Sequence, residues 1–259
     1  MNKIKNIKIL KDKVVISLED SNKLELDKDV FTNFYLYEGK EISKKELKQI
    51  TSFNQSVYLW NYALKLRQKH LYSEFKMREK LYEKGGSKEE IDQVIKRLKQ
   101  NDLIDDNAFI EEYIEYYNEL LYGKNKIINK LLEKGIFMDK INKIKFSKSV
   151  ERKKAKALLP KLEKKYSKDN NKQKKNHIYQ AYLTNGYENE LAMEMANGIA
   201  ENSPKEEDDK LKKEYQKAYI RLSKKYEKKE LKNKLINYLL SKGYKMKDII
   251  SLLERSSKW

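Results

Sequence analysis

The chain contains no cysteine, and this absence removes several kinds of chemistry. Without a thiol there is no disulfide, no thiolate nucleophile and no cysteine-bound metal, which suits a reducing compartment. Glycine and proline are also scarce, with 8 and 2 among 259 residues. Because sheets and doubly wound folds need more turn-forming residues, so few breakers predict a mainly helical protein.

Long apolar runs are absent as well. No uninterrupted stretch approaches the ~18 residues of a membrane span. The first residues, MNKIKNIKILKDKVV, lack the apolar segment and small residues of a signal peptide. We therefore expect a cytoplasmic protein without a membrane partner.

Metal-binding histidine pairs are missing too. The only two histidines, His70 and His177, lie far apart in the sequence. Catalytic zinc sites bring histidines together at short spacing, as in HExxH. We expect no metal, no cofactor and no catalytic residues.

What the chain does have is positive charge, and it is unevenly placed. The net charge is +18, with 58 Lys and Arg against 40 Asp and Glu. Residues 1–50 carry a net +2, residues 51–122 a net −2 and residues 123–259 a net +18. A genome-wide preference for lysine would act evenly along the chain, so this asymmetry indicates a polyanionic partner.

The excess is densest in residues 143–175, which hold 14 basic and 3 acidic side chains. Lysines act as point charges toward phosphates, so we predict that this region binds its polyanionic partner without sequence specificity. A solvated helix face is the simpler alternative for such a charge run. The candidate contact residues are Lys148, Arg152, Lys153, Lys154, Lys156, Lys164, Lys168, Lys172, Lys174 and Lys175.

The N-terminal segment has a different pattern from the rest. In residues 3–26, apolar side chains alternate at period two around the polar breaks at Asp12 and Asp20-Ser21-Asn22. This pattern predicts three short strands, which need a helix to pack against. Short helices are expected within residues 27–50.

From about residue 52 the apolar period becomes helical, and one unit recurs. The segments KLYEKGG, KLLEKGI, AYLTNGY and YLLSKGY place Gly85, Gly135, Gly186 and Gly243 at separations of 50, 51 and 57 residues. Each glycine is expected to end a helix as the left-handed residue after its last turn. A recurring unit of about 50 residues predicts tandem three-helix repeats in an elongated, curved array. The predicted parts are a β segment (1–50) and four repeats (51–102, 103–147, 148–202 and 203–259).

A cluster of three aspartates lies where the first repeat ends. Asp102, Asp105 and Asp106 are close enough in sequence to suggest a metal or acid/base site. They also lie where one helix stops and the next begins, so Asp105 or Asp106 is expected to cap the following helix, with Asp102 in the turn. A metal-dependent nuclease is the competing interpretation, although no second acidic cluster or histidine accompanies them.

The region around these aspartates resembles the signature of the RecX family. The matching run is YSEFKMREKLYEKGGSKEEIDQVIKRLKQNDLIDDNAFIEEYIEYY (72–117). It departs from the family pattern at Phe75, where leucine is usual, and at Asn107, where arginine is usual. The residues that match are Ser73, Glu74, Lys80, Leu81, Lys84, Gly85, Asp105, Asp106, Ala108, Phe109 and Tyr113.

The resemblance is to the long Gram-positive form, and it implies tandem three-helix repeats behind a small β-containing segment. It also implies a non-enzymatic modulator of the RecA recombinase. Such a protein binds the RecA–single-stranded DNA filament and inhibits its recombinase, ATPase and co-protease activities in DNA repair and the SOS response. We expect a monomer. The alternatives are a helical-repeat adaptor for an acidic protein and a membrane-surface protein with basic amphipathic helices.

Overall fold

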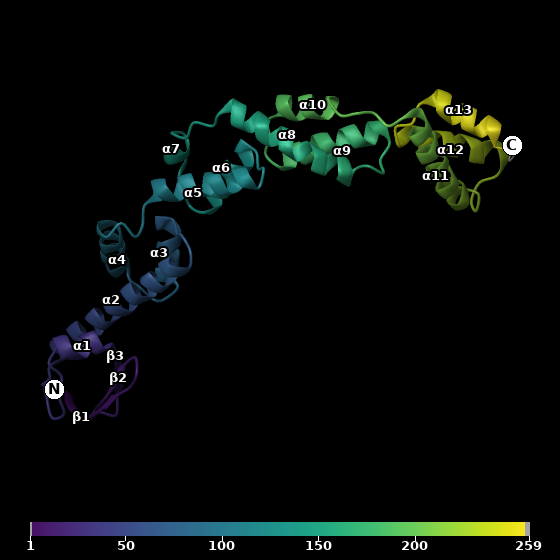
Figure 1. Cartoon of the computed structure of the whole chain (residues 1–259). Coiled ribbons are helices and arrows are strands. Elements are labelled where there is room, and N and C mark those ends of the chain that lie inside the picture. The colour runs from purple at the N-terminus through teal and green to yellow at the C-terminus, as the bar shows by residue number, and fades with distance from the viewer. Residues whose placement is uncertain (1, 257–259) are drawn as a thin grey trace. The chain divides into compact units, whose positions relative to one another are not determined.

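The first residues form a small antiparallel sheet. The computed structural model describes residues 2–256 (Figure 1). Strands β1 (Asn2–Ile9), β2 (Val14–Leu18) and β3 (Lys23–Leu26) pair in sequence order, which confirms the three predicted strands. A fourth strand, β4 (Glu41–Ile42), pairs with β1 and gives the order β3-β2-β1-β4. A strand of two residues is too short to show an alternation of apolar and polar side chains, so β4 was not predicted.

The sheet buries one face against helices. Burial along β2 alternates residue by residue, as expected for a strand with one covered face. Ile16 on β2 shares a core with Val30 of α1 (Lys28–Asn33) and Ile50 of α2 (Lys44–Lys69). A sheet of so few short strands is barely stable by itself, so α1 and α2 complete the core of the N-terminal segment.

After the sheet, the regular structure of the described residues is helical. The helices that follow α2 are α3 (Glu74–Tyr82), α4 (Lys88–Gln100), α5 (Asp106–Glu119), α6 (Lys124–Glu133), α7 (Met138–Ile141), α8 (Lys148–Lys165), α9 (Asn171–Thr184), α10 (Asn189–Asn197), α11 (Pro204–Leu222), α12 (Lys228–Ser241) and α13 (Met246–Arg255). A mainly α fold with a small N-terminal β segment is therefore confirmed.

Two helices differ from expectation. Helix α2 begins at Lys44, within the region where only short helices were expected, and continues to Lys69, since no glycine or proline interrupts it. Helix α7, in the third-helix place of the predicted repeat 103–147, is a single turn.

The chain forms two compact units. The first comprises Met1–Tyr113 and Leu131–Met138, and the second comprises Ile114–Lys130 and Asp139–Trp259. The finer division into five parts remains a prediction.

In three places, three consecutive helices enclose one core. One core joins α2, α3 and α4, a second joins α8, α9 and α10, and a third joins α11, α12 and α13. Ile91, Val94, Ile95 and Leu98, spaced at i, i+3, i+4 and i+7, form an apolar stripe on α4 that is buried in the first of these cores. Ser87 and Glu90 form a capping box at its start.

The recurring glycines end helices as predicted. Gly85, Gly135, Gly186 and Gly243 have φ angles of +78°, +77°, +84° and +94°. These values lie in the left-handed region that residues with a side chain adopt at a cost.

Three of these glycines also contact the preceding helical set. We call each contact a repeat joint: the start of helix α3, α6 or α9 meets the end of the second helix of the following set. In the first joint, Ser73 Oγ donates to the Lys134 carbonyl at 2.5 Å. In the second, the Gly123 amide donates to the Asn185 carbonyl at 2.7 Å. In the third, Asn170 Nδ2 donates to the Lys242 carbonyl at 2.9 Å.

A carboxylate from the following set completes each joint. The backbone amides of Glu74, Lys124 and Asn171, each at the start of a second helix, donate to these carboxylates. Free amides at a helix start are satisfied by such acceptors. The accepting residues are Asp106 (2.8 Å), Glu151 (3.0 Å) and Glu207 (2.8 Å).

The aspartate cluster is thus structural. Asp105 accepts from the Asn107 amide at 2.8 Å and caps α5, and Asp102 turns the chain with a φ of +52°. Asp106 lies in the first turn of α5, as expected, but its carboxylate caps α3. The capping interpretation is confirmed, with the additional finding that Asp106 connects two helices far apart in sequence.

Candidate nucleic-acid interface

The outer face of helix α8 carries a group of exposed lysines. Leu162 of this helix is buried and Leu158 half-buried in the core shared with α9 and α10. Lys153, Lys156 and Lys164 are exposed, and because an α-helix turns ~100° per residue they project from one side. No ion pair neutralises these three among the described residues, so their charges are available to phosphates.

Three further predicted residues are also exposed and unpaired within residues 2–256. Lys148 begins α8, Lys168 lies in the turn after it, and Lys172 lies in the first turn of α9. Each keeps its ammonium group accessible, as a phosphate contact requires.

Two predicted residues have acidic partners on the surface. The Arg152 guanidinium pairs with Glu194, and the Lys175 ammonium lies 3.3 Å from Glu201. Exposed ion pairs of this kind contribute little stability, so a phosphate can replace either carboxylate.

Lys154 does not fit the predicted role. Its side chain is 6% exposed, and its ammonium contacts Glu151 at 2.5 Å, Asn118 at 2.7 Å and the Tyr122 carbonyl at 2.6 Å. These partners take up the donors of the ammonium group. The prediction that Lys154 contacts DNA is therefore corrected: Lys154 holds the second joint by positioning Glu151, which caps α6.

Lys174 is likewise internal. Its side chain is 10% exposed, and its ammonium donates to the Ala200 carbonyl at 3.3 Å, with Glu163 at 3.7 Å. It lies on the same face of α9 as the buried Ile178 and Tyr182, so it faces the core. Lys174 leaves the set of candidate contacts for that reason.

We expect Lys154→Ala to lower the free energy of unfolding by about 2–3 kcal/mol, because it leaves the half-buried Glu151 carboxylate without its cation and the Tyr122 carbonyl without its donor. Lys153→Ala, at the neighbouring exposed position, should change it by less than about 0.5 kcal/mol. Urea denaturation followed by circular dichroism measures both. Equal stability of the two variants would contradict the structural role of Lys154.

Sequence reasoning missed one cation on the outer face of α8. Lys161 is exposed between Lys156 and Lys164 and has no ion pair in the described part of the chain. The helical spacing alone would have included Lys161, since it lies eight residues after Lys153 and three residues before Lys164, on the same side of the helix.

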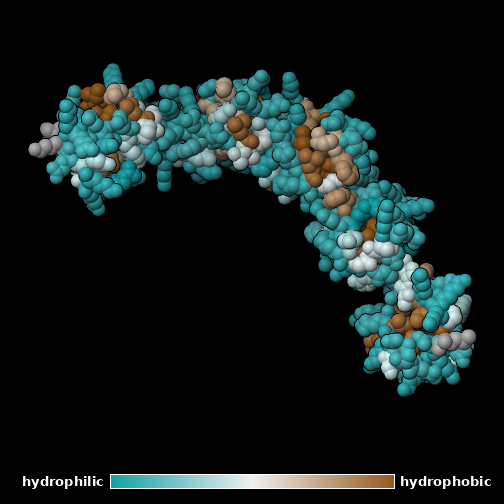
Figure 2. All heavy atoms as spheres, turned by 180° about the vertical axis from the view of Figure 1, so that it is seen from behind, coloured by the Kyte–Doolittle hydropathy of each residue, from teal (hydrophilic) through white to brown (hydrophobic). Residues whose placement is uncertain are grey.

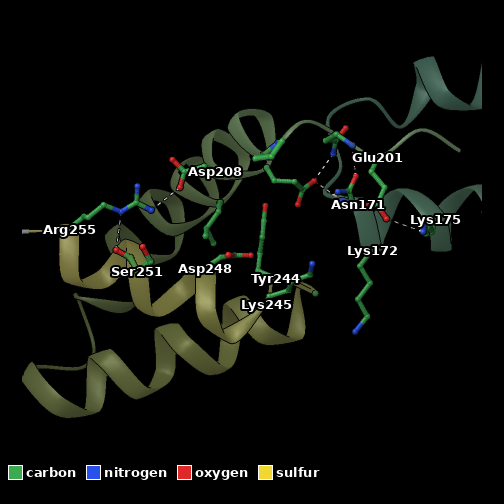
Figure 3. Close-up of a pocket in the computed structure, with 15 residues that line it drawn as sticks. Asn171, Lys172, Lys175, Glu201, Asp208, Tyr244, Lys245, Asp248, Ser251 and Arg255 are labelled. Atoms are coloured by element: carbon green, nitrogen blue, oxygen red, sulfur yellow. Dashed lines mark hydrogen bonds and ion pairs between the residues drawn. The ribbon is translucent and has the colours of Figure 1, made fainter.

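The third joint contains a hollow of about 690 Å³ (Figure 3). Acidic and basic side chains both line it. Arg255 and Lys212 pair with Asp208 at 3.1 and 2.6 Å, and the hydrogen bond from Lys212 holds the pKa of Asp208 below its usual value. Burial raises the pKa of Tyr244 in the same wall. Lys172 extends away from the other labelled side chains and is exposed.

A metal site does not emerge within residues 2–256. No group of three His, Asp or Glu side chains there is arranged to hold a metal ion. Nor does any helix in that range have the length and apolar character needed to cross a bilayer.

Comparison with known proteins connects this fold to one family. The chain is 32% identical over 260 residues to the regulatory protein RecX of Streptococcus agalactiae strain NEM316, covering 97% of this chain and 98% of that protein. A crystal structure of regulatory protein RecX matches 76% of this chain and all of its own, with a TM-score of 0.57 and 23% identity. The crystal structure of RecX from Lactobacillus salivarius matches 55% of this chain and 95% of its own, with a TM-score of 0.50 and 26% identity.

No family model matches the chain. The relation therefore stands on the full-length similarity to curated relatives named regulatory proteins, and on the shared mainly helical fold. The chain belongs to the RecX family of regulatory proteins.

Proposed function

We propose that this protein binds the RecA–single-stranded DNA filament and inhibits its recombinase, ATPase and co-protease activities during DNA repair and the SOS response. It acts as a cytoplasmic monomer and is not itself an enzyme. The proposal rests on membership of the RecX family and on one observation above all: the exposed, unpaired lysines of α8.

These lysines suit a filament that contains DNA. Each phosphate contact releases counterions from the strand, so a set of accessible ammonium groups gives strong, salt-dependent and sequence-independent binding. The excess charge of +18 lies within residues 123–259, which include α8. Lys153, Lys156 and Lys164 of that region are exposed, on one side of α8, and without an ion pair among the described residues.

An adaptor for an acidic protein is the alternative, since unpaired lysines also attract clustered carboxylates. The two functions differ in their dependence on nucleic acid. An adaptor needs no DNA and has no reason to alter the turnover of a recombinase.

The test is ATP hydrolysis by the cognate RecA on single-stranded DNA, measured while this protein is titrated in. We expect inhibition by the wild-type protein and at least about tenfold weaker inhibition by the variant K153E/K156E/K164E, because it repels the phosphates that the wild type attracts. Circular dichroism of the variant controls for folding. No effect of the wild type at large excess would reject the proposal and favour the adaptor.

A further inference from the structure

The three repeat joints share a geometry but differ in chemistry. A methyl group added to Gly135, Gly186 or Gly243 would meet a residue in the first turn of the second helix of the preceding set. That residue is Phe75 in the first joint, Lys126 in the second and Lys172 in the third. The residue against the glycine is thus aromatic in the first joint and a lysine in the other two.

A second position shows the same contrast. The residue two places after the glycine is Phe137 in the first joint, Glu188 in the second and Lys245 in the third. In the second joint Glu188 pairs with Lys124 at 3.1 Å. In the first joint the two phenylalanines, Phe75 and Phe137, contact edge to face with ring centroids 6.4 Å apart.

The aromatic side chains of the first joint are open to solvent. Phe137 is 65% exposed, Phe75 is 40% exposed, and Tyr82, two turns along α3 from Phe75, is 75% exposed. Between Phe75 and Tyr82 lies a hollow of about 420 Å³, whose wall also includes Ile91. Figure 2 shows hydrophobic patches of this kind as separate areas on a largely hydrophilic surface. Exposed aromatic groups around a hollow mark a site of protein association more often than an accident of the surface.

The charges around this hollow are mostly neutralised. Arg78 pairs with Glu74 at 2.9 Å and with Asp92 at 2.5 Å. Glu79, also in the wall, pairs with Lys76 at 2.7 Å. Lys88 is the exception in the lining, exposed and without an ion pair among the described residues. Such a surface offers little attraction for a polyanion and suits an apolar side chain.

We infer that the exposed aromatic group of the first joint, Phe75, Tyr82 and Phe137, is the surface that receives an apolar side chain of the recombinase, the protein component of the filament. The inference rests on the proposed function. A filament presents two chemistries, phosphate and protein, and the chain separates the groups that match them. Residues 1–122 carry 22 basic and 22 acidic groups and include most of the aromatic hollow, whereas the remaining residues carry the whole positive excess.

The test compares the variant Tyr82→Ser/Phe137→Ser with Ile220→Ser, which removes an apolar side chain of α11 that is 63% exposed. Phe75 is left in place because it packs against Gly135. Fluorescence anisotropy gives the affinity of wild type and both variants for bare single-stranded DNA and for the same DNA coated with recombinase. We expect the double variant to lose about tenfold in affinity for the filament and less than about twofold for bare DNA, while Ile220→Ser changes neither.

Each other outcome has a distinct meaning. If wild type binds the filament and the double variant binds it equally well, the aromatic surface is not the recombinase contact. An equal loss of affinity for bare DNA would mean that the rings stack on bases, and it would overturn the inference. Sedimentation that shows a wild-type dimer, and a monomer for the double variant, would mean that a second copy covers the surface; this result too would overturn the inference. If wild type does not bind the filament at all, the proposed function fails and the inference fails with it.

Discussion

Gly186→Ala should lower the free energy of unfolding by about 4 kcal/mol or more, whereas Gly85→Ala should lower it by about 1–2 kcal/mol. Both glycines end a helix in the left-handed region, with φ of +84° and +78°. The added methyl group therefore imposes a similar backbone strain at both sites. The difference arises from what surrounds the new methyl group.

At Gly186 the second joint leaves no room. An added Cβ would lie 2.2 Å from the Lys126 backbone nitrogen and 2.4 Å from its Cβ. Backbone cannot move aside there, because the Asn125 amide donates to the Gly186 carbonyl at 3.0 Å in the same joint. At Gly85 an added Cβ meets nothing within 4 Å. Gly85 thus serves as the matched control, with strain and without overlap.

Hydrogen exchange and chemical denaturation check this prediction. In Gly186→Ala, the amides of α6 and α9 should lose protection, because the joint between them opens. In Gly85→Ala, protection throughout the second compact unit should stay as in the wild type. A similar loss of stability in both variants would mean that strain alone matters and that the joint is not tightly packed.

The variant K153E/K156E/K164E should bind single-stranded DNA about 100-fold more weakly than wild type at low salt. Its salt dependence should also be shallower, with the slope of log K against log salt reduced by about 2, since each lost phosphate contact removes about 0.7 on a single strand. These three side chains are exposed and unpaired, so their replacement should leave the fold intact.

The control changes the net charge by the same amount at another place. Lys8, Lys28 and Lys48 are also exposed, and they lie within the first 50 residues, where basic and acidic groups nearly balance. Replacing these three lysines by glutamate should reduce the affinity for single-stranded DNA by less than about threefold, which is the effect of the lower net charge alone. If both triple variants lose affinity equally, the overall charge and not the face of α8 governs binding.

Local patterns predicted much of this fold. The alternation at period two, the stripe on α4 and the glycines at helix ends each report on neighbours within a few residues, so the sequence reveals them directly. Charge density does not show which side of a helix a lysine occupies, so it predicts the same role for the buried Lys154 and Lys174 as for their exposed neighbours. Lys174 precedes Ile178 and Tyr182 at spacings of four, which places it on the buried side of α9.

Other features lie beyond such reasoning because their partners are distant in sequence. Asp106 caps a helix that starts 32 residues earlier, and Glu207 caps one that starts 36 residues earlier. A carboxylate at a helix start predicts a cap for its own helix, and only the packed joint shows that it caps another. The aromatic group of the first joint is similar, since Phe75 and Phe137 come together only because α3 meets the end of α6.

Binding to the filament through two surfaces can be tested by measuring the affinity of the wild-type protein for a recombinase-coated single strand and for the bare strand of the same length at physiological salt. We expect the filament to bind at least about tenfold more tightly, because it engages both the lysines of α8 and the aromatic surface of the first joint. Equal affinity for the two, or preference for the bare strand, would contradict it and leave a DNA-binding protein without a recombinase contact.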